Sequence, residues 1–199
     1  MSIMPDMNES IKILTEKSKE LGDDVYEVCK PILEDERFPL WSGSSKPFQH
    51  HYGKGGLISH VEEVVSLCFM VKNYFTHDVD EKELFLSAFY HDVGKMYDYS
   101  PKCGYNYNVW NSAEHKRYIH HISRSGIMWS SNATLNKDIY DKYFEKVLHA
   151  ILAHHTAREY GSPVAPKSRV AWMVTLCDNL SARMYDADTF DVLNRKDLK

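Results

Sequence analysis

The chain has 199 residues, of which 43% are hydrophobic and 26% charged, and its formal net charge is −4. This length supports one well-buried core and is too short for two ordinary domains. The acidic net charge argues against a protein that binds long nucleic acid, because such proteins usually carry an excess of basic residues. A local basic groove is still compatible with this composition. No apolar run approaches the roughly 20 residues that cross a bilayer, the first ten residues contain no basic side chain, and the four cysteines form no C-x-x-C pair. We therefore expect a cytoplasmic protein without a membrane segment.

Apolar residues recur at helical spacing along most of the chain, and convincing alternating strands are absent. This pattern predicts helices over Glu9–Leu21, Asp24–Glu34, Gly56–Phe75, Glu81–Val93, Ala113–Trp129, Lys137–His155 and Lys167–Tyr185. Asp80 and Glu83, three residues apart, indicate a capping box at the start of the fourth helix. The predicted fold class is all-α, a helical bundle in a single domain.

Two of the loops between these helices are informative. The segment Trp41–Gly56 is rich in glycine and serine and contains the pair His50-His51. The segment Met96–Asn111 contains four tyrosines, including Tyr107, and one tryptophan. These aromatic side chains either form a wall that stacks on a base and shapes the substrate, or fold back onto the core, and the sequence leaves both alternatives open.

The strongest local signal is an apolar helix that ends in His91-Asp92-Val-Gly94-Lys95. Burying an ionised carboxylate without a partner is costly, and a divalent cation bound by His91 and Asp92 removes that cost. Gly94 lets the backbone leave the helix, and Lys95 then places a positive charge beside the site. This pattern after a buried helix is much more specific than a His-Asp pair alone.

The other candidate ligands lie on four further predicted helices: His60, His120, His121, His154, His155 and Asp178. Taken singly, each histidine is more often an ordinary core or surface residue than a ligand. Asp178 is harder to explain without one, because it lies in mid-helix between apolar flanks. The small residues on its face leave room for an ion beside the carboxylate.

The order His60, His91-Asp92, Asp178 on an all-helical chain resembles the HD superfamily of metal-dependent phosphohydrolases. Three segments are also similar to the HD domain of YhaM-type 3′→5′ exoribonucleases: His50–His60, Tyr118–Ile122 and Leu152–Pro163, the last followed by Asp178–Ala182.

This resemblance implies a division of the chain into three parts. Residues 48–186 match the HD phosphohydrolase domain, residues 1–47 are expected to form N-terminal helices that pack on its core, and residues 187–199 a C-terminal tail. The exoribonucleases carry an OB-type nucleic-acid-binding domain before the HD domain. Because residues 1–47 are predicted to form two helices and no strand, we expect the OB domain to be missing.

The resemblance also implies a role for each matching residue. The ligands of the primary metal are His60, His91, Asp92 and Asp178. His121 and His154 match the histidines that hold a second ion in binuclear members, with Asp92 then bridging the ions. The expected catalytic residues are Asp92 and Lys95, and the expected substrate contacts are Lys95, Arg158, His155 and Tyr107, although a surface salt bridge explains Arg158 equally well. Mixed histidine and aspartate ligation favours one or two ions of Mn, Fe, Co, Ni or Zn over Mg or Ca.

We expect a phosphohydrolase that cleaves phosphate ester or anhydride bonds of nucleotides, as a nucleotidase or dNTP phosphohydrolase, with a metal-activated water as nucleophile. The alternative is a 3′→5′ exonuclease or phosphodiesterase that acts on short oligonucleotides. A non-catalytic nucleotide-binding regulatory module comes third, because decayed sites usually lose a ligand and this one keeps them all. The expected partner is a nucleotide or short oligonucleotide, and the sequence is also compatible with a homo-oligomer.

Overall fold

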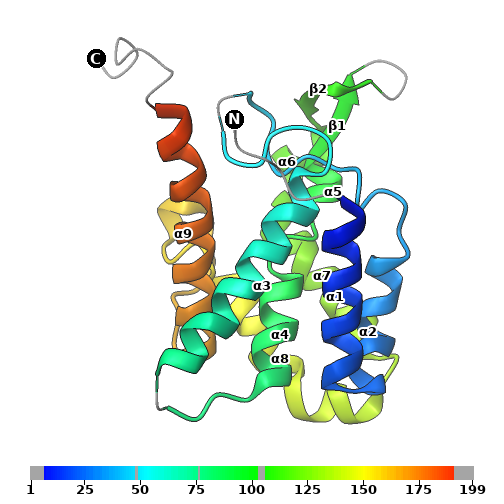
Figure 1. The fold of residues 1–199 in the computed structure, drawn as a ribbon, viewed down its shortest axis with the longest axis vertical. Coiled ribbons are helices and arrows are strands. Elements are labelled where there is room, and N and C mark those ends of the chain that lie inside the picture. The colour runs from blue at the N-terminus through cyan, green and yellow to red at the C-terminus, as the bar shows by residue number, and fades with distance from the viewer. Residues whose placement is uncertain (1–6, 48, 76, 103–105, 191–199) are drawn as a thin grey trace.

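The computed structural model describes residues 7–47, 49–75, 77–102 and 106–190. Helices dominate it (Figure 1): α1 (Met7–Leu21), α2 (Asp23–Leu33), α3 (Gly56–Tyr74), α4 (Glu81–Tyr90), α5 (Lys95–Asp98), α6 (Glu114–Tyr118), α7 (His120–Ala133), α8 (Lys137–Ala153) and α9 (Arg169–Phe190). Two short strands, β1 (Tyr99–Lys102) and β2 (Asn106–Ser112), and a 3₁₀ turn, η1 (Arg158–Tyr160), complete the described elements. The predicted all-α bundle is therefore confirmed. None of the described helices combines the length and apolar character that crossing a bilayer requires.

Helix α4 lies at the centre of the bundle and is buried along most of its length. It contacts α3, α8 and α9, and this explains why it is apolar on nearly every side. Asp80 begins the helix, because its carboxylate accepts hydrogen bonds from the backbone N–H groups of Lys82 (3.0 Å) and Glu83 (3.2 Å). The helix ends at Tyr90, so the rigid core delivers the next two residues, His91 and Asp92, into the interior.

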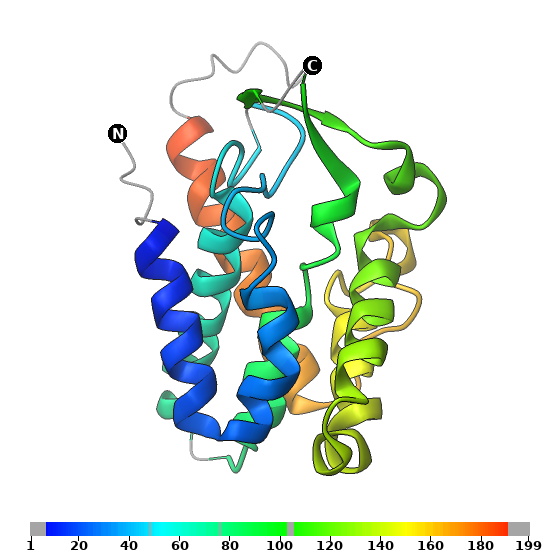
Figure 2. The ribbon, with the colours of Figure 1, turned by 90° about the vertical axis from the view of Figure 1, so that its right-hand side faces the viewer.

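Helices α1 and α2 pack on the same hydrophobic core. They lie side by side (Figure 2), and α1 also contacts α3 and α4. Leu14 of α1 and Val28 of α2 are fully buried in the cluster that contains the side chains of α4. The described helices therefore share one core, and the division of the chain at residues 47 and 186 stays a prediction.

The prediction of one continuous helix over Ala113–Trp129 is wrong, because the helix is interrupted between α6 and α7. His120 has a φ of 67°, a left-handed conformation that interrupts a right-handed helix. The break turns the start of α7, so that the backbone N–H of His121 donates to Asp98 Oδ2 at 3.1 Å. In a continuous helix this N–H would bond to a carbonyl four residues earlier.

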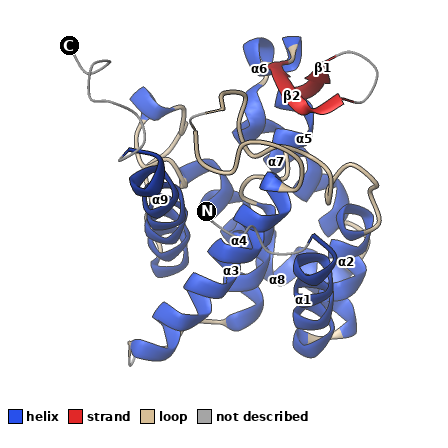
Figure 3. Cartoon of the chain, turned by 45° about the horizontal axis from the view of Figure 1, so that its top comes forward, coloured by secondary structure: helices blue, strands red, loops and turns tan. Residues whose placement is uncertain are grey.

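The predicted loop Met96–Asn111 is also wrong, since it contains most of α5 and an antiparallel hairpin of β1 and β2. A register shift within the hairpin disturbs the two-residue alternation that would have indicated strands. Trp110 is buried with its ring 5.2 Å from that of Trp41, whose Nε1–H donates to the Tyr99 carbonyl at 2.8 Å. These aromatic residues of the segment therefore fold onto the core, and the hairpin lies at one end of the bundle near the long loops (Figure 3).

The ends of the last two long helices differ from the prediction. Helix α8 ends at Ala153, so that His154 is its C-cap. Helix α9 continues past the predicted end at Tyr185 to Phe190. The rest of the predicted tail, residues 191–199, lies outside the described residues.

Candidate metal centre

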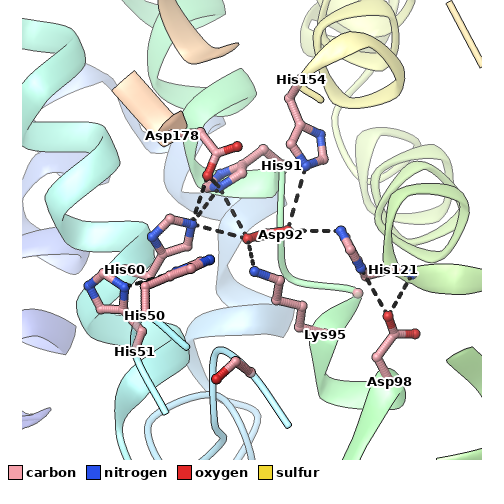
Figure 4. A network of polar contacts seen from close by, with 12 residues as sticks. His50, His51, His60, His91, Asp92, Lys95, Asp98, His121, His154 and Asp178 are labelled. Carbon is pink, nitrogen blue, oxygen red and sulfur yellow. Dashed lines mark hydrogen bonds and ion pairs between the residues drawn. The ribbon is translucent and has the colours of Figure 1, made fainter. Parts of the chain in front are cut away.

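Six buried side chains that were predicted as metal ligands come together inside the bundle (Figure 4): His60, His91, Asp92, His121, His154 and Asp178. They come from the start of α3, the segment after α4, the start of α7, the end of α8 and the middle of α9. Residues more than 100 positions apart in the sequence thereby face one another, with Asp92 in the middle.

One side of the cluster is built around Asp92 Oδ2. The Nε2 atom of His60 lies 3.1 Å from this oxygen and 3.1 Å from Asp178 Oδ1. The Nε2 atom of His91 lies 3.4 Å from Asp92 Oδ2 and 3.3 Å from His60 Nε2. The four residues offer ligand atoms that all lie within 4.8 Å of one another, so one cation between them would reach two nitrogen and two oxygen ligands.

The other oxygen of Asp92 faces a second pair of histidines. Asp92 Oδ1 lies 3.4 Å from His121 Nε2 and 3.6 Å from His154 Nε2. Asp92 therefore presents one carboxylate oxygen to each side, as a residue that bridges two ions does.

The polar atoms of the cluster that lack hydrogen bonds are the ones that would coordinate an ion. Both oxygens of Asp92, His121 Nε2 and His154 Nε2 are buried and have no hydrogen bond of acceptable geometry, although Asp92 Oδ2 forms an ion pair with the Lys95 ammonium at 2.6 Å. Orphaned polar atoms of this kind are rare and costly in a folded protein. Imidazole nitrogens and carboxylates together suit a divalent transition metal, so the residues fit such ions.

The other ring nitrogens of the histidines are held by the protein. The Nδ1–H groups of His91 and His154 donate to the backbone carbonyls of Ala88 and Ile151, each at 2.6 Å. This contact leaves the Nε2 lone pair of each ring directed at the centre, as in metal sites where an outer partner sets the tautomer.

His121 and His60 are oriented by side chains. His121 Nδ1–H donates to Asp98 Oδ2 at 2.9 Å. His60 Nδ1–H donates to Ser181 Oγ at 3.0 Å, and the Ser181 hydroxyl donates to Glu63 Oε2 at 2.8 Å. The sequence does not single out Asp98 or Glu63, because no local pattern distinguishes a carboxylate that supports a ligand.

The electrostatic environment favours positive charge at the centre. Burial raises the pKa of Asp92, but the Lys95 ammonium, 2.6 Å from Asp92 Oδ2, and His91 outweigh it and hold that pKa well below its usual range. Burial lowers the pKa of His60 and His154, yet the nearby carboxylates raise both above the ordinary value. Burial also lowers the pKa of His121 to about 3 despite Asp98, so this ring is neutral at neutral pH, as a metal ligand must be.

Gly94 has a different function from the one expected. Its backbone angles, φ −61° and ψ −18°, are open to any residue, so it is not needed to let the chain leave the helix. A Cβ at this position would lie 2.3 Å from the His121 carbonyl oxygen and 2.7 Å from the Ser125 nitrogen. Glycine is required here because α7 packs directly against the backbone after Asp92.

A cavity of about 570 Å³ opens beside the centre and is lined by Lys95, His155 and Asp178 among others. Two predicted substrate contacts, Lys95 and His155, therefore lie at this cavity. Arg158 is exposed and lines a separate depression with His149. Tyr107 packs near Trp110, with ring centroids 5.7 Å apart, and is not among the described lining residues.

Other lining residues were not candidates in the sequence. In the sequence His50 stands out only as part of a histidine pair, yet it lines the cavity and its ring lies 5.4 Å from that of His60. Lys116 and Arg183 also face the cavity. Nothing in their local sequence separates them from the other surface cations.

Comparison with known proteins places these residues in a family context. The family model described as HD domain matches residues 57–183. Three curated relatives, each named 3′-5′ exoribonuclease YhaM, are 28% identical: those of Bacillus subtilis (over 135 residues), Bacillus velezensis (over 141) and Bacillus licheniformis (over 137). The alignments cover 68%, 70% and 68% of this chain and 41%, 42% and 41% of the relatives, so the chain spans about two fifths of their length. No solved structure matches the chain significantly.

Proposed function

This chain belongs to the HD domain family, as the sequence predicted, and we propose that it is a metal-dependent phosphohydrolase that cleaves phosphate ester or anhydride bonds of nucleotides. In this proposal the HD unit spans residues 48–186. His60, His91, Asp92 and Asp178 hold one divalent ion, and Asp92, His121 and His154 hold a second.

The observation that carries the proposal is the position of Asp92, whose two buried oxygens face two separate groups of histidines without a hydrogen bond of acceptable geometry, while Oδ2 also forms an ion pair with the Lys95 ammonium. Divalent ions bound there would lower the pKa of a coordinated water and polarise a phosphoryl oxygen. The surrounding hydrogen bonds hold each imidazole in place before substrate arrives, so little reorganisation is needed during reaction.

Lys95 has a distinct part in this proposal. Its ammonium is buried beside Asp92 and lines the cavity. Burial works to lower the pKa of Lys95, but Asp92 raises it above its usual value, so the group stays charged. A fixed positive charge at the cavity wall is suited to stabilising negative charge on a phosphoryl group.

A second candidate is a 3′→5′ exonuclease that acts on short oligonucleotides. The observation that favours it is the match to relatives named 3′-5′ exoribonuclease over about 70% of this chain. Both candidates use the same hydrolytic chemistry on phosphorus. They differ in what occupies the cavity beyond the cleaved bond.

One experiment tests both candidates. The protein is reconstituted separately with Mn, Fe, Co, Ni and Zn and incubated with nucleoside monophosphates, dNTPs, cyclic nucleotides and a labelled oligonucleotide. Hydrolysis of the mononucleotides supports the first candidate, whereas release of mononucleotides from the oligonucleotide alone supports the second. Full activity of an Asp92→Ala variant after chelation and remetallation would contradict the metal centre itself.

A further inference from the structure

The cavity beside the candidate metal centre contains two cationic side chains that the proposed centre does not use, Lys116 and Arg183. With Lys95 they make three lysine or arginine side chains among the described lining residues, against one carboxylate, that of Asp178. The chain as a whole is acidic, with a net charge of −4. The cavity is therefore lined by more positive than negative side chains although the chain as a whole is acidic. Such a cavity attracts an anionic ligand.

Lys116 is held in position by a tyrosine. Its ammonium donates to the Tyr99 hydroxyl at 3.1 Å and lies 4.6 Å from the centroid of the same ring. Tyr99 is buried in β1 and its carbonyl accepts the hydrogen bond from Trp41. Within the described part of the chain Lys95 forms an ion pair with Asp92, whereas no ion pair includes Lys116. Since an ammonium has three N–H donors, Lys116 can donate to an anion in the cavity while it keeps the Tyr99 contact.

Arg183 reaches the same cavity from another element. It lies on α9 little more than one turn after Asp178, whereas Lys116 lies on α6. Figure 3 shows α6 and α9 on different sides of the loops at this end of the bundle. A guanidinium binds two phosphate oxygens at once, and an ammonium acts as a point charge, so both side chains are suited to binding a phosphate group in this cavity.

Building on the proposed function, we propose that Lys116 and Arg183 form a second phosphate subsite, which binds the phosphoryl group next to the one that is hydrolysed. The centre and Lys95 already accommodate the reacting phosphoryl group. A nucleoside monophosphate has no further anionic group, whereas nucleoside diphosphates, nucleoside triphosphates and 5′-phosphorylated dinucleotides have at least one. The substrate class is therefore a nucleotide with at least two phosphate groups, joined either as an anhydride or through a phosphodiester.

Binding without turnover tests the subsite directly. The metal-reconstituted protein is titrated calorimetrically with inorganic phosphate and with inorganic pyrophosphate. Because charge-assisted hydrogen bonds are among the strong ones, pyrophosphate should bind about tenfold or more tightly than phosphate. Lys116→Gln and Arg183→Gln should each remove most of this preference, and Lys116→Arg should retain it.

Arg117→Ala is the matched control, because Arg117 is an exposed cation on the same helix as Lys116 and is not among the residues that line the cavity. This variant should keep the full preference for pyrophosphate. Equal affinity of the wild type for both anions would overturn the subsite. So would an unchanged preference in both glutamine variants, since the metals alone would then explain it.

Kinetics on matched substrates identify the source of the second phosphate. A nucleoside monophosphate is compared with its diphosphate, and a dinucleotide with its 5′-phosphorylated form. For the pair that the wild type distinguishes, each glutamine variant should raise KM about tenfold for the doubly phosphorylated member, with kcat little changed. Equal losses on both members would overturn the subsite and leave the proposed function intact. If the wild type hydrolyses nothing, the proposed function fails, and the pyrophosphate titration still decides the subsite.

Discussion

Asp98 Oδ2 accepts two hydrogen bonds from His121, one from its backbone N–H at 3.1 Å and one from its Nδ1–H at 2.9 Å. The other oxygen of Asp98 accepts a hydrogen bond from His115 Nδ1–H at 3.1 Å. Asp98 thus fixes both the main chain and the ring of a proposed ligand. Among the four proposed histidine ligands, His121 is the one whose Nδ1–H donates directly to a carboxylate.

Asp98→Asn should therefore weaken the second ion selectively. Loss of an outer partner of a metal-binding histidine typically lowers metal affinity about 10- to 100-fold. We expect the metal content, measured by mass spectrometry after dialysis against a limiting metal buffer, to fall from two ions towards one. Asp23→Asn, which changes an exposed carboxylate on α2, is the control and should leave the metal content unchanged. Loss of both ions, or of neither, would contradict this assignment.

Removal of metal should lower the thermal stability of the protein. The ions bind the folded state, and at a free concentration of about 100 Kd one ion stabilises it by about 2.7 kcal/mol. We expect a chelator to lower the melting temperature by several degrees for a domain of this size, as followed by circular dichroism. In Asp92→Asn the chelator should have little effect, because the side chain between the two groups no longer offers a carboxylate. If the chelator does not change the melting temperature of the metal-loaded wild type, the protein does not contain buried ions that stabilise it.

Gly94→Ala should destabilise the fold and disturb the second ion. The new Cβ would lie 2.3 Å from the His121 carbonyl oxygen, so α7 would have to move away from Asp92. Overpacking of this kind typically costs about 1–3 kcal/mol of unfolding free energy, which denaturant titration measures.

Gly126→Ala is the matched control for Gly94→Ala, because it also lies against a neighbouring element but its one tight contact would be with a Leu148 methyl, at 3.1 Å. The Leu148 side chain can rotate away, and alanine is more favourable than glycine in a helix interior. We expect a change close to zero. If the two variants lose equal stability, the close approach of α7 is not the reason for glycine at position 94.

Asp80→Ala should remove a pH-dependent contribution to stability. Burial raises the pKa of Asp80, but the Glu83 N–H and the Tyr143 hydroxyl outweigh it and lower that pKa in the folded state. The stabilisation is therefore present above the unfolded pKa of about 3.9 and is lost as the pH falls through the lower folded pKa. An N-cap is typically worth about 1 kcal/mol, and partial exposure keeps the effect modest.

Denaturant titrations at several pH values measure this effect. At neutral pH Asp80→Ala should unfold more easily than the wild type, and the difference should shrink as the pH falls below about 4. Asp78→Ala, two residues earlier, changes an exposed carboxylate outside the helix and should cost little at any pH. A difference that is constant across this range would show that ionised Asp80 is not the source.

The sequence alone predicted the helical bundle, since a repeat of apolar residues and a capping aspartate are local properties of the chain. It also predicted which residues meet at the centre, because His91-Asp92 and the wider pattern with His60 and Asp178 can be read without coordinates. The hairpin of β1 and β2 escaped prediction, because its irregular register hides the alternation of a strand.

The tertiary structure alone decided which side chains support or extend the centre. Asp98 orients His121, Lys116 and Arg183 enter the cavity, and Arg158 stays outside it. The need for glycine at position 94 likewise depends on how closely α7 approaches. Each of these facts depends on a distance between elements that are separate in the sequence, and a local pattern contains no information about such distances. The sequence therefore determined the proposed ligands, and packing determined what holds them in place and what lies beside them.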